Sequence, residues 1–410
     1  MFVRSNHRAF ELSNVRTNEQ TRVPRWVRVR PPAHLLPTVV GAQLLVLGLW
    51  FSGSAVAPDL AASWGLAHVS WITLAVQLGF VLGTLVVALS GLADRVPPHH
   101  VFLGGALLGA AANALLPWTS NAALGLGLRV LTGAALAGVY PIGMKLLASW
   151  YARAGASLGL LVAALTLGSG SPFLVRGLGL STGTVVWTAS LLAAAGGIAL
   201  ALVARPGPLL PARSPFRLRM FAAAFRAPDF RASALGYFGH MWELYAFWGL
   251  APLWLVARGI GAADAARLAF VIFLAGAVGA AAGGALSRRV GEARVARVAL
   301  AGSASCCLAS PFFFTASMTW VIPFLAVWGA LVVADSAQFS ALSARAAPRE
   351  GVGTALTLQT TIGFAITFGS ILLVPLVADA LGWRVAFLVL APGPILGWLA
   401  MRRVSTSVPS

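Results

Sequence analysis

Apolar runs of about 20 residues recur along the whole chain and constrain its fold more than any other feature. Each run is long enough to cross a hydrocarbon core about 30 Å thick as a helix that rises 1.5 Å per residue. Of the 410 residues, 59% are hydrophobic and only 10% are charged, whereas soluble domains carry about 25% charged residues. This composition is too apolar to cover a surface that faces water, so we expect an all-α integral membrane protein.

Twelve spans fit the sequence, six on each side of a polar stretch that contains proline and arginine. We predict them at 35–57, 68–90, 100–117, 121–148, 156–176, 180–204, 233–257, 265–287, 295–316, 319–344, 351–374 and 383–401.

The predicted organisation has five parts. It consists of a disordered cytoplasmic tail over 1–34, a six-helix bundle over 35–204, a cytoplasmic central loop over 205–232, a second six-helix bundle over 233–401, and a cytoplasmic tail over 402–410. Most connections between spans are short, so they have no room for a soluble catalytic domain.

The basic residues predict the orientation, because lysine and arginine are retained on the cytoplasmic side. With both termini inside, nearly all of the 29 basic residues fall in cytoplasmic segments. The exceptions are Arg129 within a span and, outside, Arg176, Arg258, Arg267 and Arg384. This distribution accounts for the net charge of +18 through contact with anionic lipid heads, without nucleic acid. Frequent Ala, Gly and Arg codons indicate a bacterial source, and hence the inner membrane.

The two predicted halves share local features that indicate an internal duplication, as in many secondary transporters. The second span of each half carries a Gly-xxx-Gly pair, Gly79 with Gly83 and Gly279 with Gly283. Small residues at this spacing let helices approach closely. Each of these spans ends in a similar cytoplasmic loop, over 90–96 and 284–291. We therefore expect two pseudo-symmetric bundles.

The first of these loops, with its core Leu92-Ala93-Asp94-Arg95, resembles the signature of the major facilitator superfamily between its second and third helices. Ser90, Pro97 and the Pro98-His99-His100 run depart from that signature. The resemblance implies the fold of that superfamily and transport by alternating access. It also implies a gate in which Asp94 and Arg95 work with the second loop, where Arg288 and Arg289 stand. The alternative is a solvated loop that only helps to fix topology.

Ionisable side chains inside spans are costly and therefore candidates for function. The chain has few, namely Arg129, His240, Glu243 and Asp335. By resemblance, the first, fourth, seventh and tenth helices line the central cavity, and three of these carry the four residues. Glu243 is the strongest candidate for a proton carrier, with His240 three residues away on the same helical face. The alternative is a structural ion pair of Glu243 with Arg129 or His240, and Arg129 is also a candidate for binding an anionic solute.

Aromatic residues around Glu243 predict a cavity wall, because Tyr and Trp combine an apolar face with one hydrogen-bonding group. Trp242 and Tyr245 flank Glu243, and Trp50 and Trp328 are weaker candidates on the first and tenth spans. Plain packing is the alternative for each of them.

Other classes of protein lack support in the sequence. There is no Walker motif, no catalytic constellation and no spacing typical of a metal site, and the adjacent Cys306 and Cys307 are interpreted as packing residues. We expect no enzyme activity, no metal and no cofactor. The expected partners are a small solute (an organic anion, a metabolite or a drug-like compound), protons and the bilayer, and the expected state is a monomer. A facilitative uniporter and a non-transporting membrane sensor remain as alternatives.

Overall fold

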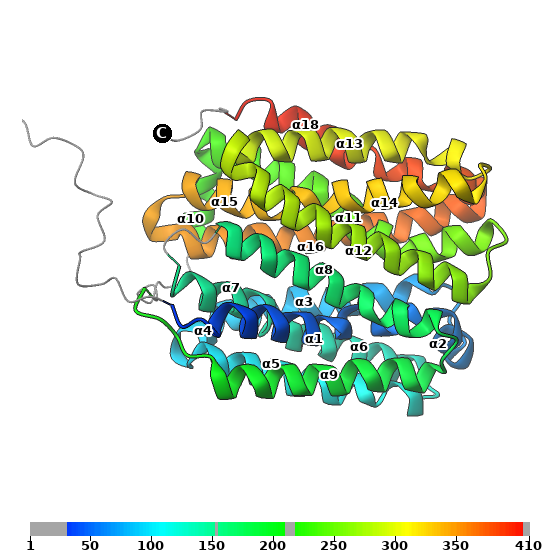
Figure 1. The fold of residues 1–410 in the computed structure, drawn as a ribbon, viewed down its shortest axis with the longest axis horizontal. Coiled ribbons are helices and arrows are strands. Elements are labelled where there is room, and N and C mark those ends of the chain that lie inside the picture. Colours follow the sequence, from blue (N-terminus) through cyan, green and yellow to red (C-terminus); the bar gives the residue numbers. More distant parts are fainter. Residues whose placement is uncertain (1–30, 152–154, 210–217, 405–410) are drawn as a thin grey trace, which may run out of the picture.

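Long helices that lie side by side make up the protein (Figure 1). The computed structural model describes residues 31–151, 155–209 and 218–404, and these residues form helices and connecting turns without any strand. Of the predicted tails, 1–34 and 402–410, residues 1–30 and 405–410 lie outside the described residues.

The first half of the chain forms the lower layer in Figure 1. Its helices are α1 (Leu35–Ala55), α2 (Ala57–Trp64), α3 (Ser70–Ser90), α4 (Leu92–Arg95), α5 (Pro98–Ala114), η2 (Leu116–Trp118), α6 (Ala122–Leu136), α7 (Tyr140–Ala148), α8 (Gly155–Gly177) and α9 (Thr182–Val203). We call this layer the N-bundle.

The second half forms the upper layer, called the C-bundle (Figure 1). Its helices are α10 (Leu218–Arg226), α11 (Pro228–Ala257), α12 (Ala262–Val290), α13 (Glu292–Phe313), α14 (Met318–Ala334), α15 (Ser336–Ala346), η3 (Arg349–Gly351), α16 (Val352–Leu381), α17 (Trp383–Ala386), η4 (Phe387–Leu390) and α18 (Pro392–Met401). Because α11 begins at Pro228, the seventh helix starts five residues before the predicted span.

Eleven helices in the described residues are long and apolar enough to cross a membrane. They match eleven of the twelve predicted spans. The remaining one, α11, is 30 residues long but less apolar, since His240 and Glu243 interrupt its central stretch. Its length exceeds the roughly 20 residues that a crossing requires, and it packs inside the C-bundle against α16 and α18.

The two ends of the helical structure can be told apart by where the first helix starts and the last helix ends. The start of α1 and the end of α18 lie on the left of Figure 1, together with α4, α10 and α15, and α2 lies on the right. We call the left side the terminal end and the right side the far end. The bundles contact each other mainly where α3 packs on α16 and where α8 packs on α12.

The predicted duplication appears in the packing of the glycine pairs. A Cβ at Gly79 or Gly83 of α3 would clash with the α6 backbone, at the carbonyls of Val130 and Ala134. A Cβ at Gly279 or Gly283 of α12 would clash in the same way with the α14 backbone at Ala330 and Ala334. Each contact recurs 200 positions later, so the same close helix crossing is built twice, as the Gly-xxx-Gly spacing predicts.

Alanine substitutions at Gly79 and Gly279 test how much these close helix crossings stabilise the protein. We expect Gly79→Ala and Gly279→Ala each to destabilise the protein by about 1–3 kcal/mol, because the added methyl group must push two backbones apart. Gly127→Ala is the matched control, since a Cβ there meets no other atom within 4 Å. Thermal unfolding of the detergent-purified protein measures the effect, and equal melting temperatures for all three variants would contradict it.

Candidate functional site

Helix α11 presents two chemically different faces, and this difference organises the site. Successive residues on a helix are rotated by about 100°, so Glu243 and Tyr245 point to nearly opposite sides. Tyr245 contacts rings of the N-bundle, whereas Glu243 bonds to groups of α13 and α14. One helix therefore connects the contact between the bundles to the interior of the C-bundle.

A layer of aromatic rings fills the contact between the bundles. It comprises Trp50, Phe51, Phe80 and Phe173 from the N-bundle and Tyr245, Trp248, Phe273 and Phe364 from the C-bundle. We call these eight residues the aromatic layer. Trp50 lies 5.5 Å from Tyr245 and 5.4 Å from Phe364 between ring centroids, and Phe80 lies 4.4 Å from Phe364. The two bundles thus meet through direct ring contacts.

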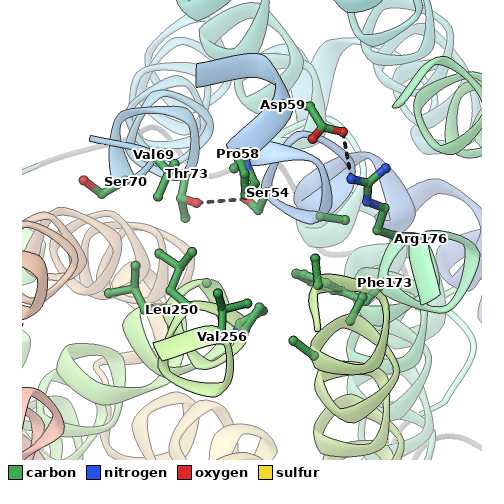
Figure 2. A pocket seen from close by; sticks show the side chains of 18 residues that line it. Ser54, Pro58, Asp59, Val69, Ser70, Thr73, Phe173, Arg176, Leu250 and Val256 are labelled. Carbon is green, nitrogen blue, oxygen red and sulfur yellow. Dashed lines mark hydrogen bonds and ion pairs between the residues drawn. The ribbon is translucent and has the colours of Figure 1, made fainter. Parts of the chain in front are cut away.

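A cavity of about 90 Å³ lies on the far-end side of this layer, and Figure 2 shows the side chains that line it. Leu250 and Val256 of α11 face Ser54 and Thr73 of the N-bundle across it. Ser54 and Thr73 share a hydrogen bond of 2.9 Å. Phe173 belongs both to the cavity wall and to the aromatic layer, so the layer closes the cavity toward the terminal end.

One ion pair borders the cavity. Arg176 Nη2 lies 2.8 Å from Asp59 Oδ2, and Thr182 donates its hydroxyl proton to the same oxygen at 2.5 Å. The pair joins α2 to the far end of α8 (Figure 2). The cavity border therefore carries two opposite charges that neutralise each other.

Glu243 lies in the interior of the C-bundle, with a side chain that is 1% exposed. Trp328 Nε1 donates to its Oε1 at 2.6 Å, and Cys307 Sγ donates to the same oxygen at 3.3 Å. Oε2 has no hydrogen-bond partner in the part of the chain that the structure describes. The alternative of an ion pair with Arg129 or His240 is wrong, because both of those side chains bond elsewhere.

His240 pairs with Asp335 instead, at 2.9 Å between Nδ1 and Oδ1. Its Nε2 lies 3.1 Å from the hydroxyl of Ser336, and both members of the pair are about 2% exposed. Asp335 is the single residue between α14 and α15. His240 and Glu243 thus share the C-bundle side of α11, as their spacing predicts, but contact different groups.

Arg129 lies wholly inside the N-bundle. Its Nη1 donates to the carbonyl of Leu49 at 3.0 Å and to Asn113 Oδ1 at 3.3 Å, and its Nη2 donates to the carbonyl of Trp50 at 2.5 Å. Gly53 covers the guanidinium so closely that a Cβ there would lie 2.8 Å from Nε. This geometry favours a role in holding α1 to α6 over the expected binding of an anionic solute.

The four candidate tryptophan and tyrosine residues separate into two groups. Trp50 and Tyr245 belong to the aromatic layer. Trp242, expected at the cavity wall, packs instead against Gly393 of α18, and its Nε1 donates to the carbonyl of Val389 in η4 at 2.9 Å. Trp328 stacks on Phe247 inside the C-bundle, with centroids 4.1 Å apart, and bonds to Glu243.

The signature loop makes its ion pair within one bundle. Asp94 Oδ1 accepts a hydrogen bond of 2.5 Å from Lys145 Nζ, which also donates to the carbonyl of Ala93 at 2.6 Å. The expected partners, Arg288 and Arg289 of the other half, are exposed, as is Arg95, and no ion pair within the described ranges joins them to Asp94. Lys145 is the one lysine of the chain, and it was not among the residues predicted for the gate.

The architecture defines the class of protein, a multi-pass membrane protein built from two related helical bundles. The chain belongs to the Major Facilitator Superfamily, whose sequence model matches residues 39–368. The crystal structure of the human organic anion transporter MFSD10 (TETRAN) superposes with a TM-score of 0.71 at 19% sequence identity, covering 91% of this chain and 100% of that one. This likeness shows a shared fold. No curated protein matches the sequence.

The bond between Trp328 and Glu243 yields a prediction for stability. Trp328→Phe keeps the ring packing but removes the indole donor, so we expect a loss of about 1.5–3 kcal/mol, the usual contribution of a hydrogen bond to a charged group. Trp254→Phe is the matched control, because Trp254 is also buried against Phe387 but its Nε1 has no partner among the described residues.

Thermal unfolding of both variants, alone and combined with Glu243→Leu, which removes the acceptor, completes a double-mutant cycle. A coupling energy near zero between positions 243 and 328 would show that the bond does not stabilise the protein.

Proposed function

We propose that the protein is a secondary active transporter that moves a small solute by alternating access and couples this movement to protons. Membership of the superfamily supports transport. The observation that carries proton coupling is the buried carboxylate of Glu243, which is held by an indole and a thiol and has no cationic partner among the described residues. Such a group can exchange a proton with little rearrangement of its neighbours, as a carrier requires.

The two ends of the structure differ in how closely the bundles approach each other, which supports access of a solute from the far end only. The cavity lies toward the far end, whereas the bundles close tightly toward the terminal end, where a Cβ on Gly159 would lie 3.4 Å from Gly284 Cα. Further opening at the far end requires the bond from Arg267 Nε to the carbonyl of Gly177, 2.7 Å long, to break. The rocking of the two bundles about the aromatic layer would then expose each side in turn.

Coupling follows from the contacts of α11. Glu243 ties α11 to α14 through Trp328, and His240 ties α11 to α15 through Asp335. Protonation removes the negative charge of Glu243 and weakens its charge-assisted bond. The other face of α11 contacts the N-bundle through Tyr245, so a proton can bias the relative position of the bundles.

The cytoplasmic gate is proposed to use the pair of Asp94 with Lys145. This pair fixes the turn between α3 and α5 to α7 within the N-bundle. The proposed gate also includes Arg95, Arg288 and Arg289, which are exposed on the same end. The proposal places the terminal end in the cytoplasm of a bacterium, in agreement with the basic residues gathered there, and treats the monomer as the working unit.

Replacement of the carboxylate tests the coupling. We expect Glu243→Gln to abolish accumulation driven by a pH gradient in proteoliposomes, because the amide cannot carry a proton, while counterflow exchange of the same solute persists. The solute is first selected by thermal-shift screening of the purified protein against metabolites and drug-like compounds. Asp264→Asn is the control, since Asp264 is an exposed carboxylate that pairs with Arg267 at the far end.

Two results would contradict the proposal. Full gradient-driven accumulation by Glu243→Gln would eliminate the proton role of this residue. Binding without any movement of solute in the unmodified protein would indicate a sensor rather than a transporter.

A further inference from the structure

At the aromatic layer, the contact between the bundles combines eight uncharged rings with buried polar groups that have no hydrogen-bond partner among the described residues. We propose that this contact binds an uncharged solute that has a flat aromatic body and hydrogen-bonding groups such as an amide, a carbonyl or a hydroxyl. The proposal specifies the solute class of the transport function and rests on that function.

The rings supply the flat surfaces. Trp50, Phe80, Tyr245 and Phe364 pack with centroids 4.4 to 5.5 Å apart, two rings from each bundle. This spacing is that of direct ring contact, at which offset or tilted aromatic pairs are favourable. When the bundles separate, each bundle loses its aromatic partner, and a flat aromatic solute can replace the lost contact.

Buried polar groups without hydrogen-bond partners among the described residues belong to the aromatic layer or share a helix face with it. Gln77 is fully buried, and neither its amide nitrogen nor its amide oxygen has a hydrogen-bond partner among the residues that the structure describes. Gln77 shares a face of α3 with Thr73, which lines the cavity, and with Phe80 of the aromatic layer. The indole nitrogens of Trp50 and Trp248 are likewise buried without a partner in the described part of the chain.

Such groups destabilise a protein unless something completes their hydrogen bonds. Gln77 offers both a donor and an acceptor, and the two indoles offer donors. The matching ligand therefore carries acceptors and at least one donor, which is the pattern of an amide, a carbonyl or a hydroxyl rather than of an ion.

The charges of the protein also disfavour a charged solute. Of the charged side chains that the structure describes, Arg129, Glu243 and Asp335 are buried, and each makes its contacts inside its own bundle. At the cavity border, Asp59 and Arg176 neutralise each other. An ionic solute would lose its hydration at the aromatic layer, where none of the eight ring side chains carries a charge to replace it.

Three probes with one ring system and different charges test the proposal. Equilibrium dialysis against the detergent-purified protein compares 2-naphthamide, 2-naphthoate and 2-naphthylmethylammonium. We expect the neutral amide to bind at least about tenfold more tightly than either ion. Tighter binding of either ion, or no binding of the amide up to millimolar concentration, would overturn the proposal.

Variants locate the binding site. We expect Gln77→Leu and Trp50→Leu each to weaken amide binding about five- to tenfold, a size typical of one buried hydrogen bond or ring contact. Trp118→Leu is the control, because Trp118 lies on the exterior, 69% exposed, against Trp187. Gln77→Leu should also leave the melting temperature of the ligand-free protein unchanged or higher, since it removes an unpaired amide, and a lower melting temperature with unchanged binding would assign Gln77 a purely structural role.

The outcomes separate this proposal from the transport function. Binding of 2-naphthamide with no accumulation in proteoliposomes would contradict transport and leave the solute class standing. Gradient-driven accumulation of a solute that carries a net charge through the Gln77 and Trp50 site would contradict the solute class and leave transport standing.

Discussion

The scarcity of partners for charge inside a membrane is the constraint on which the rest of the structure depends. A charged side chain in hydrocarbon is costly, so each one must be met by protein groups. Arg129 meets this requirement with the backbone of α1 and Asn113, and Asp335 meets it with His240. Glu243 meets it only in part, through two neutral donors. Glu243 is therefore a buried carboxylate that the described residues leave without a cationic partner.

Helix α11 links the surroundings of Glu243 in the C-bundle to the contact with the N-bundle. Its C-bundle face carries His240 and Glu243, and its opposite face contributes Tyr245 and Trp248 to the aromatic layer. The glycine contacts of α3 with α6 and of α12 with α14 hold neighbouring helices tightly within each bundle. Rigid bundles that meet at a layer of rings favour movement between the bundles over deformation within them.

The sequence was sufficient for most of the fold because its signals are local. Apolar runs and Gly-xxx-Gly spacing predict the spans and the duplicated crossings, and the Leu92–Arg95 loop predicts the superfamily. Helix α11 is the exception in composition, since the candidate residues His240 and Glu243 also make it less apolar. The partners of the candidate residues were not predictable, because Glu243 with Trp328 and Asp94 with Lys145 are contacts between distant segments. A helical period fixes which residues share a face but not which neighbour that face contacts, so the sequence could not show that Trp242 packs against α18.

The most direct test of proton coupling is to measure whether protons cross the membrane together with the solute. Proteoliposomes that enclose a pH-sensitive dye and start without a pH gradient report protons carried across the membrane when the solute is added on one side. The account predicts a change of internal pH that requires the solute and is absent from liposomes without protein. Movement of the solute with no change of internal pH would contradict proton coupling.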